Sequence, residues 1–233
     1  MPGRIERIIV ALVFAIAALL FSLWPQLDTS LSAMFYSPGE GFALDHLAIV
    51  QAVYWGVWYG SRIAIISVVL LWLAGFAMRG GWLESRRRWF GFLALAIAIG
   101  PGLITDAGLK NHWGRARPNQ IQAFGGDKQF TPALLPSDQC DRNCSFVSGH
   151  ATGAFAIMAF GWLAAPRRRA RWLAGATLAG ALVGLVRIVQ GGHFLSDVIF
   201  AFLAVWLGCW LAAAILNRFG LLPRSDQLPV ALR

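Results

Sequence analysis

A histidine and an aspartate four residues apart have the types and spacing of a catalytic pair. They are His193 and Asp197, and Arg187 lies six residues before the histidine. If a helix begins near His193, residues i and i+4 share a face, so the carboxylate would lie within reach of the imidazole. A carboxylate there fixes the tautomer of the ring and stabilises its charged form, which suits a nucleophile or a base. The alternative is a polar interruption between two membrane helices, with His193 capping one of them.

Two further polar clusters precede this pair in the chain. The first runs from Lys110 to Pro118, and the second runs from Cys144 to His150 and includes Ser148-Gly149-His150. A helix that begins near Ser148 would present free backbone N–H groups and the positive end of its dipole to an anion. Together with the stretch around His193, these clusters supply Lys110, Arg117 and Arg187 as cations and His150 and His193 as imidazoles. This set suits a phosphate group, with nucleophilic displacement at phosphorus and protonation of a leaving group.

No group of carboxylates accompanies these clusters, so we expect chemistry without a metal or another cofactor. Cys140 and Cys144 lie four residues apart between the first and second clusters, and Cys209 lies alone in a later apolar segment. A zinc site would need more ligands than this pair offers, because His112 is distant in sequence. We therefore expect a local disulfide beside Ser145, with two free thiols as the alternative.

The composition is that of a membrane protein with one domain. Of the 233 residues, 58% are hydrophobic and 13% are charged, whereas soluble domains are roughly half apolar and about a quarter charged. No repeat or long linker divides the chain, so we predict a single domain, residues 1–233, whose chemistry lies between about 105 and 200. The first apolar run, residues 5–24, lacks a small-x-small cleavage site and is expected to be a retained signal-anchor helix.

Six apolar segments each come close to the roughly 20 residues that cross a bilayer, which predicts an all-α, six-helix transmembrane bundle. The segment 42–60 is also apolar, but it carries Asp45 and His46, which we expect to face solvent. It is expected to form an interfacial helix or an extension of the second span. The predicted spans are Ile5–Trp24, Ser61–Met78, Trp89–Leu109, Val147–Ala165, Trp172–Val189 and Leu195–Asn217.

Basic residues flank the predicted spans mainly on one side of the membrane. Since basic loops stay in the cytoplasm, both termini are predicted to be cytoplasmic and the three polar clusters to lie at the opposite membrane surface. Binding to nucleic acid would also explain the net charge of +9, but the charges lie in short loops beside the spans, so no nucleic-acid partner is expected. The 13 of 20 basic residues on that side are Arg4, Arg7, Arg79, Arg86, Arg87, Arg88, Arg167, Arg168, Arg169, Arg171, Arg218, Arg224 and Arg233.

The loop from Lys110 to about residue 146 is long and carries five basic residues against this trend. Charge placed there needs another cause, and anion binding is the obvious one. Arg115 is expected either to contact a second phosphate or a headgroup sugar, or simply to face the lipid surface. Asp106 lies four residues before Lys110 on the same helical face, where it either positions the lysine or makes a purely structural contact.

The three clusters, in this order, resemble the signature of the type 2 phosphatidic acid phosphatase superfamily: K-x6-R-P, then P-S-G-H, then S-R-x5-H-x3-D. Val147 replaces the proline of the second motif, and Val186 replaces the serine of the third. The missing serine leaves less support for the phosphate-binding groups and puts the fine specificity in question. The resemblance covers about residues 30–215. The matching positions are Lys110, Arg117, Pro118, Ser148, Gly149, His150, Arg187, His193 and Asp197.

The resemblance implies a metal-independent phosphatase that forms a phosphohistidine. His193 would attack phosphorus, with Asp197 orienting the ring. His150 would protonate the leaving alkoxide and then activate water for the second step. The groups that would hold the phosphoryl oxygens are Lys110, Arg117, Arg187, Ser148 and the Gly149 amide.

A membrane lipid phosphate is the implied substrate class. Six membrane spans suit a lipid substrate, and they disfavour the branch of the superfamily that contains the soluble haloperoxidases. Residues 143–151 resemble the lipid A 4'-phosphatase branch, so we expect lipid A dephosphorylation at the periplasmic face of a bacterial inner membrane. An undecaprenyl diphosphate or phosphatidylglycerophosphate phosphatase would use the same chemistry. A non-catalytic lipid-phosphate binding or transport protein is the alternative from another class, but it would need the cations and not the two histidines. The sequence indicates no oligomeric state.

Overall fold

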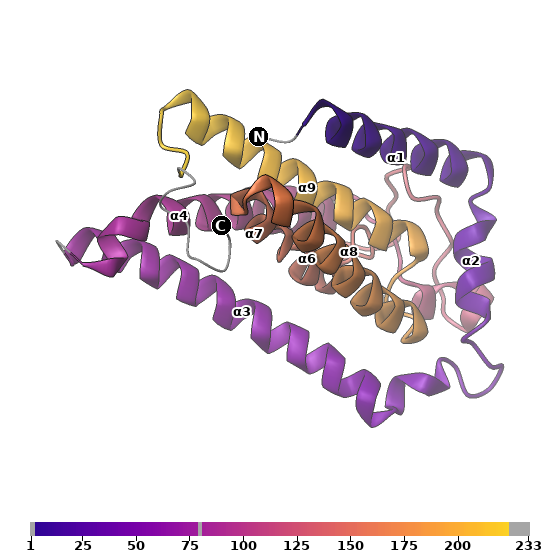
Figure 1. Cartoon of the computed structure of the whole chain (residues 1–233). Helices are drawn as coiled ribbons and strands as arrows, with labels where there is room; N and C mark the ends of the chain where they lie inside the picture. The colour runs from indigo at the N-terminus through magenta and orange to yellow at the C-terminus, as the bar shows by residue number, and fades with distance from the viewer. Residues whose placement is uncertain (1–2, 79–80, 224–233) are drawn as a thin grey trace.

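The computed structural model describes residues 3–78 and 81–223, and this part of the chain is helical, without a β-strand. Five helices are long and apolar enough to cross a membrane, and they form one bundle (Figure 1). The prediction of an all-α fold is thereby confirmed for the described residues. Arg79, Arg224 and Arg233, which contribute to the predicted orientation, lie outside the described residues. The five segments are Arg4–Leu23 (α1), Ala48–Ala77 (α3), Trp82–His112 (α4 and its continuation), Arg168–Val189 (most of α8, Pro166–Val189) and Leu195–Arg218 (α9).

The fourth predicted span forms two short helices and not one long helix. They are α6 (Gly149–Phe155) and α7 (Met158–Leu163), and most of their residues are buried. Residues 149–163 would reach about 22 Å as one helix, less than the roughly 30 Å apolar layer of a bilayer. The described residues thus contain five candidate spans where six spans were expected, and α6 and α7 pack against α8.

The second predicted span begins earlier than expected. α3 starts at Ala48, so most of the segment 42–60 extends this helix and does not form a separate interfacial helix. No proline interrupts α3, and the Ser61 hydroxyl donates back to the Trp58 carbonyl group (3.3 Å) within the helix. The chain reaches α3 through α2 (Gln26–Ala33) and a short 3₁₀ turn, η1 (Ala43–His46).

The third predicted span changes its helical geometry before it reaches the long loop. α4 (Trp82–Ile97) continues as a π-helical stretch, η2 (Ala98–Leu109), and ends in α5 (Lys110–His112). Pro101 lies in η2 and cannot donate a backbone hydrogen bond, which favours such a change. A Cβ atom built on Gly208 of α9 would lie 2.4 Å from the Gly100 Cα atom. The two glycines therefore let the backbones cross closely and fix where Lys110 emerges.

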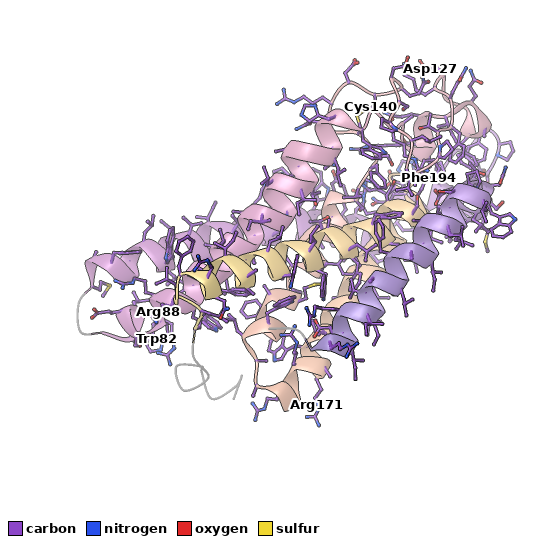
Figure 2. The ribbon with its side chains drawn as sticks, turned by 90° about the horizontal axis from the view of Figure 1, so that it is seen from above. Trp82, Arg88, Asp127, Cys140, Arg171 and Phe194 are labelled. Carbon is purple, nitrogen blue, oxygen red and sulfur yellow. A yellow bond between two sulfur atoms is a disulfide. The ribbon has the colours of Figure 1, made fainter. Side chains whose placement is uncertain are left out.

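The long loop after α5 covers one end of the bundle. It contains two 3₁₀ turns, η3 (Pro118–Gln120) and η4 (Gln122–Phe124), before the chain enters α6. Figure 2 shows Asp127 and Cys140 of this loop, with Phe194, at one end of the molecule, whereas Trp82, Arg88 and Arg171 lie toward the other. The loop is anchored by a cluster of buried apolar residues, namely Phe42, Ala116, Ile121, Phe124 and Phe194.

Candidate active site

A cavity of about 350 Å³ lies beside the long loop, bounded by α3, η2, α5, α6 and the end of α8. It brings together both predicted histidines and the three predicted phosphate-binding cations, which come from three separate parts of the sequence. Asp197, Ser148 and Arg115 do not line it. The predicted site residues that do line it are Lys110, Arg117, Gly149, His150, Arg187 and His193.

A tight turn between α8 and α9 presents His193. The Arg187 carbonyl group accepts hydrogen bonds from the backbone N–H groups of Gly192 (2.9 Å) and His193 (3.3 Å). Gly191 has a φ of +61°, a conformation that glycine adopts without steric cost. At the start of α9, the Asp197 carboxylate accepts the Phe194 N–H (2.9 Å), which caps the helix. The third motif thus contains the residues that form this turn as well as His193 and Asp197.

Within the described part of the chain, the polar contacts of the His193 ring involve Nδ1 and leave Nε2 free. Nδ1 lies 2.8 Å from the Ser145 carbonyl oxygen and 3.5 Å from Asp197 Oδ2. Two acceptors at this nitrogen assign the proton to Nδ1 and leave a lone pair on Nε2. Burial, with the positive charges of Lys110 and Arg187, lowers the pKa of His193 well below its ordinary value, although Asp197 opposes this. The ring is therefore neutral, as a nucleophile requires.

Asp197 is buried and its carboxylate is shared among several donors. Oδ1 accepts from Arg115 Nη1 (2.6 Å), and Oδ2 accepts from the Ser145 hydroxyl (2.5 Å) as well as from the Phe194 N–H. The contact with the imidazole is the longest of these. Ser145 was not predicted as a site residue, yet its carbonyl group is the nearest acceptor for the ring and its hydroxyl holds the aspartate.

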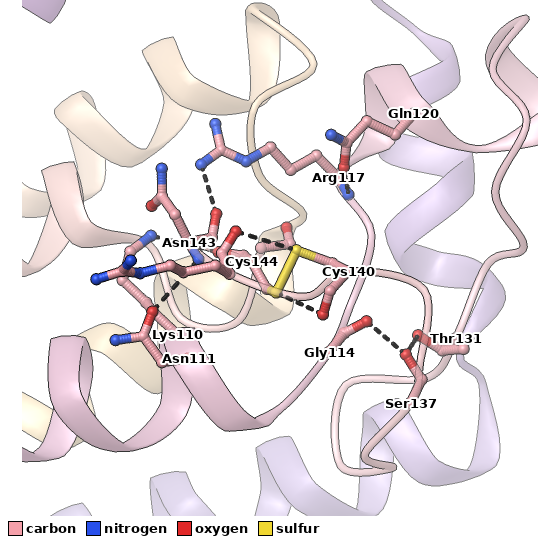
Figure 3. Close-up of a disulfide and its surroundings, with 12 residues drawn as sticks. Lys110, Asn111, Gly114, Arg117, Gln120, Thr131, Ser137, Cys140, Asn143 and Cys144 are labelled. Atoms are coloured by element: carbon pink, nitrogen blue, oxygen red, sulfur yellow. Dashed lines mark hydrogen bonds between the residues drawn. A yellow bond between two sulfur atoms is a disulfide. The ribbon is translucent and has the colours of Figure 1, made fainter.

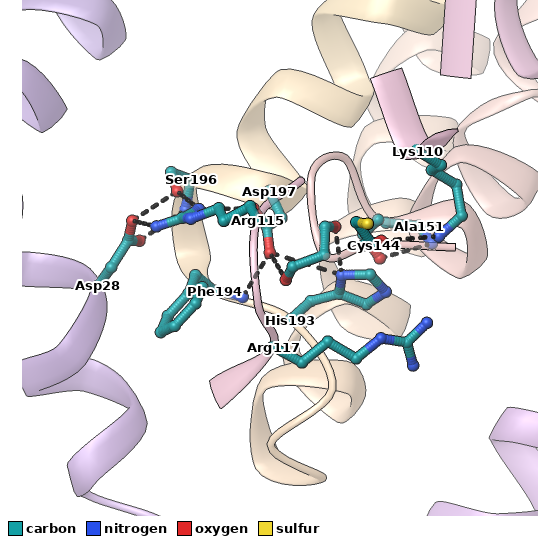
Figure 4. A network of polar contacts seen from close by, with 12 residues as sticks. Asp28, Lys110, Arg115, Arg117, Cys144, Ala151, His193, Phe194, Ser196 and Asp197 are labelled. Carbon is teal, nitrogen blue, oxygen red and sulfur yellow. Dashed lines mark hydrogen bonds and ion pairs between the residues drawn. The ribbon is translucent and has the colours of Figure 1, made fainter. Parts of the chain in front are cut away.

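Arg115 contacts neither a lipid headgroup nor the lipid surface, so both expectations for it were wrong. Its exposed fraction is 0%, and its guanidinium group lies between two carboxylates, 2.8 Å from Asp28 Oδ2 and 2.6 Å from Asp197 Oδ1 (Figure 4). It also donates to the Ser196 hydroxyl (2.8 Å) and the Thr131 carbonyl group (2.9 Å). Pairing with two buried acids stabilises the arginine in the interior.

The disulfide between Cys140 and Cys144 closes a short segment whose carbonyl groups hold two of the cations (Figure 3). Lys110 Nζ donates to the Cys144 carbonyl group (3.3 Å), and Arg117 Nη2 donates to the Asn143 carbonyl group (2.9 Å). The Cys144 N–H donates in return to the Lys110 carbonyl group (2.9 Å). These contacts fix the cations from one side and leave their other N–H groups for the cavity.

Arg187, the third cation, is held by two successive hydrogen bonds, from Arg187 to Gln190 and from Gln190 to Asp45, which form the Arg187 relay. Nη1 donates to Gln190 Oε1, and Gln190 Nε2 donates to Asp45 Oδ1 (2.6 Å). The guanidinium carbon lies 4.8 Å from the centre of the Tyr54 ring. Asp45, expected to face solvent, is only partly exposed, because its Oδ1 atom accepts from Gln190 and from Gln51 Nε2 (3.0 Å). Valine replaces the signature serine at position 186, and Gln190 supplies a side-chain contact to Arg187 in this chain.

His150 lies at the start of α6, stacked on Tyr54 with 4.4 Å between the ring centres. Its Nε2 atom and Arg187 Nε are buried side-chain atoms without a hydrogen-bond partner in the described part of the chain. Since such atoms are costly when left unpaired, a cavity lined by both favours a bound polar group. The Ser148 hydroxyl accepts from the Ala151 N–H (3.4 Å) and so caps α6, while Gly149 lines the cavity.

A family model described as the PAP2 superfamily matches residues 89–220. This chain belongs to the PAP2 superfamily. The resemblance carried by the three sequence motifs is thus confirmed. A lipid A 4'-phosphatase of Francisella tularensis subsp. novicida (strain U112) is 36% identical over 219 residues, which are 93% of this chain and 98% of that protein. No solved structure matches the chain.

Two other PAP2 relatives match a smaller part. A lipid A 4'-phosphatase of Rhizobium leguminosarum is 33% identical over 148 residues, 60% of this chain and 61% of that protein. A lipid A 1-phosphatase of Rhizobium johnstonii (strain DSM 114642 / LMG 32736 / 3841) is 34% identical over 150 residues, 62% of this chain and 56% of that protein. The similarity to the Francisella protein therefore covers a larger share of this chain than either of the other two alignments.

The PAP2 cavity also has a wall that the sequence motifs did not predict. Tyr54, Trp58 and Arg62 line it from one face of α3, since residues four apart stack along a helix. The Arg62 guanidinium carbon lies 3.5 Å from the centre of the Trp58 ring, and Nη1 donates to the Trp58 carbonyl group (2.8 Å). An arginine inside a long apolar helix is the signal that could have revealed this wall, because such charges mark functional sites in membranes.

Proposed function

We propose that this protein is a phosphatase that removes the 4'-phosphate from lipid A through a phosphohistidine on His193. The observation that carries the proposal is the Nε2 of a buried, neutral His193 in a cavity lined by four cations, three of them from the signature motifs. The Francisella relative, which aligns with 93% of this chain, supplies the substrate class by its name. The bacterial relatives and the apolar helices support a bacterial membrane protein that acts on a membrane lipid.

In the first step, His193 Nε2 attacks phosphorus, a nitrogen–phosphorus bond forms, and the bond to the sugar oxygen breaks. Burial and the nearby cations lower the pKa of His150 to about 3, so its protonated form requires the negative charge of the bound phosphate. In that form it donates a proton to the departing oxygen, which leaves as an alcohol. The phosphorylated imidazole carries a positive charge, which the Ser145 carbonyl oxygen and Asp197 stabilise at Nδ1. Lys110, Arg117 and Arg187 balance the charge of the phosphoryl oxygens throughout.

In the second step, the neutral His150 takes a proton from water, and the hydroxide oxygen attacks phosphorus. The nitrogen–phosphorus bond breaks, its electron pair returns to His193 Nε2, and inorganic phosphate is released. Both histidines are then as they began, so the cycle needs no further reactant. Stacking on Tyr54 fixes the His150 ring while it serves as acid and then as base.

A lipid substrate is supported by an apolar groove beside the cavity. This groove has a volume of about 110 Å³, and it shares Ser61, Ile65, Pro101 and Gly153 with the polar cavity. Its further lining comes from α3, α4 and the α6–α7 region and is almost wholly apolar. A phosphorylated headgroup in the cavity would therefore leave room for an attached acyl chain in the groove.

We place the cavity on the periplasmic side of the inner membrane. Arg88 and Arg171 lie toward the end of the bundle opposite the long loop (Figure 2), as the positive-inside rule requires if that end is cytoplasmic. The disulfide between Cys140 and Cys144 supports an oxidising compartment at the loop.

The test is phosphate release from lipid A by the purified protein in detergent, with mass spectrometry of the lipid. Wild-type protein is expected to give a species lighter by one phosphate, in EDTA as well. His193→Ala and His150→Ala are expected to remove turnover, and single-turnover labelling should leave phosphate on His193. Full activity of His193→Ala, or loss of activity in EDTA, would exclude this mechanism. Phosphate release from undecaprenyl diphosphate or phosphatidylglycerophosphate, with lipid A unchanged, would show that one of these lipids is the substrate in place of lipid A.

A further inference from the structure

Three charged side chains contact one another in the interior, and none of them is exposed. Arg115 lies between Asp28 of α2 and Asp197 of α9, with ion-pair distances of 2.8 and 2.6 Å (Figure 4). The exposed fraction of each of the three residues is 0%. Asp28 comes from a part of the chain that carries no signature motif, and it does not line the cavity. Its presence therefore needs an explanation other than substrate contact.

The contacts of Asp28 are those of an ionised carboxylate. Oδ1 accepts the Ser196 N–H (2.9 Å), and Oδ2 accepts from the Ser196 hydroxyl (2.5 Å) and from Arg115 Nη2 (2.8 Å). Burial raises the pKa of Asp28, and the nearby Asp197 carboxylate adds to this rise, whereas Arg115 and the Ser196 hydroxyl oppose it. Because every one of these partners is a donor, the ionised form satisfies the site best.

One cation and two carboxylates give the cluster a net charge of −1, and His193 lies at its end, 3.5 Å from Asp197. The other charged groups that act on His193 are Lys110 and Arg187, which both disfavour a positive ring. Without Asp28, Arg115 would neutralise Asp197, and only repulsion from these cations would remain. The second carboxylate therefore restores the negative charge that a positively charged imidazole needs.

We propose that Asp28 is a positioning residue of the phosphatase: it offsets the charge of Arg115 and so keeps the buried cluster negative, which stabilises the positive His193 of the phosphohistidine. This inference rests on the proposed function. It predicts an effect on the chemical step, since the residue touches no substrate. A purely structural role would instead lower the stability of the protein and leave the turnover of the folded fraction unchanged.

The decisive experiment is a charge-rescue cycle on purified protein with lipid A. Asp28→Asn removes the charge without changing the volume, and it is expected to lower kcat roughly 10- to 100-fold with KM within about threefold. Adding Arg115→Gln to this variant returns the net charge of the cluster to −1 and is expected to recover most of the loss. Asp127→Asn is the matched control, because the same substitution there alters a side chain that is 82% exposed.

Melting temperature and elution from a size-exclusion column show which variants are folded. A double variant no faster than Asp28→Asn, or a folded Asp28→Asn with wild-type kcat, would overturn the proposal. If Asp28→Asn does not fold, the double variant decides alone: it is expected to turn over within about tenfold of wild type, and a folded but inactive protein would refute the charge argument. Wild-type protein that leaves lipid A unchanged would instead refute the proposed function, so the two failures are distinct.

Discussion

Gly192 offers a sharp test of whether Arg187 holds the transferred phosphate. A Cβ atom built on this glycine would lie 2.1 Å from Arg187 Nη2 and 2.6 Å from its Cζ atom. The φ of Gly192 is not positive, unlike the +61° of Gly191, so alanine strains the contact and not the backbone. The guanidinium group is also held by Gln190 and lies over Tyr54, so the alanine must displace it against these contacts.

The size of the effect follows from the displacement. Ordinary contact begins near 3.4 Å, so Nη2 must move by about 1.3 Å from its place 2.1 Å from the new methyl group. A shift of about 1 Å in a group that positions the substrate can cost about 100-fold in rate. Loss of one donor to a developing charge costs a similar factor, about 100- to 1,000-fold. We expect Gly192→Ala to lower kcat/KM with lipid A by roughly 100-fold.

Steady-state phosphate release in detergent measures this effect, with the melting temperature as a check on folding. Gly175→Ala is the control, because it lies in α8 with Arg187 and its added methyl group meets nothing within 4 Å. The loss from Gly192→Ala should not add to that from Arg187→Ala, since both remove one contact. A folded Gly192→Ala variant within twofold of wild type, or fully additive losses, would refute the assignment of Arg187 to the phosphate.

Three further outcomes are expected. Replacing Cys140 and Cys144 together by serine frees the carbonyl groups that hold Lys110 and Arg117, so KM for lipid A should rise about tenfold. A reductant should raise the KM of the wild-type protein in the same way and leave that of the double variant unchanged. A reductant that raises both KM values equally would contradict this role of the disulfide. Arg62→Gln, on the α3 wall, should raise KM for lipid A several-fold with little change in kcat, and an unchanged KM would remove Arg62 from the headgroup site. Because burial lowers the pKa of His193, its imidazole should remain neutral as the pH falls through about 6.5, the ordinary value, and gain its proton only at lower pH. The measurement is a pH titration of the ¹⁵N-labelled ring by NMR. A midpoint near pH 6.5 would contradict the effect of burial on this ring.

The sequence predicted the lining of the cavity better than it predicted the groups that support it. The motif residues Lys110, Arg117, His150, Arg187 and His193 all line one cavity, because each motif is local and lies where a helix begins or ends. The pattern of apolar residues also predicted the class of fold. It could not show that residues 149–163 form two short helices inside the bundle, because a buried helix and a spanning helix are equally apolar.

Contacts between distant residues were beyond such patterns. Arg115 pairs with Asp28 across 87 positions, and Gln190 pairs with Asp45 across 145. Only the folded chain brings these partners together. The sequence left Arg115 as a substrate contact or a lipid-facing side chain, whereas it is fully buried, and it left Asp45 as a solvent-facing side chain, whereas it is partly buried. An unexpected charge in an apolar protein marks a site of interest, but the sequence does not tell whether its partner is a ligand or another buried side chain.

The partnership between Asp28 and Arg115 also bears on what counts as the smallest working unit of this protein. The region that defines the family, residues 89–220, contains every signature residue and none of Asp28, Asp45 and Tyr54. A fragment limited to that region would retain both histidines, but it would lose one of the two acids that balance Arg115, the end of the Arg187 relay and the ring beneath His150. The family is thus recognised from one stretch of the chain, but the site is assembled with residues from another stretch. An enzyme built by grafting the three motifs onto a different helical scaffold would also need counterparts of Asp28, Asp45 and Tyr54.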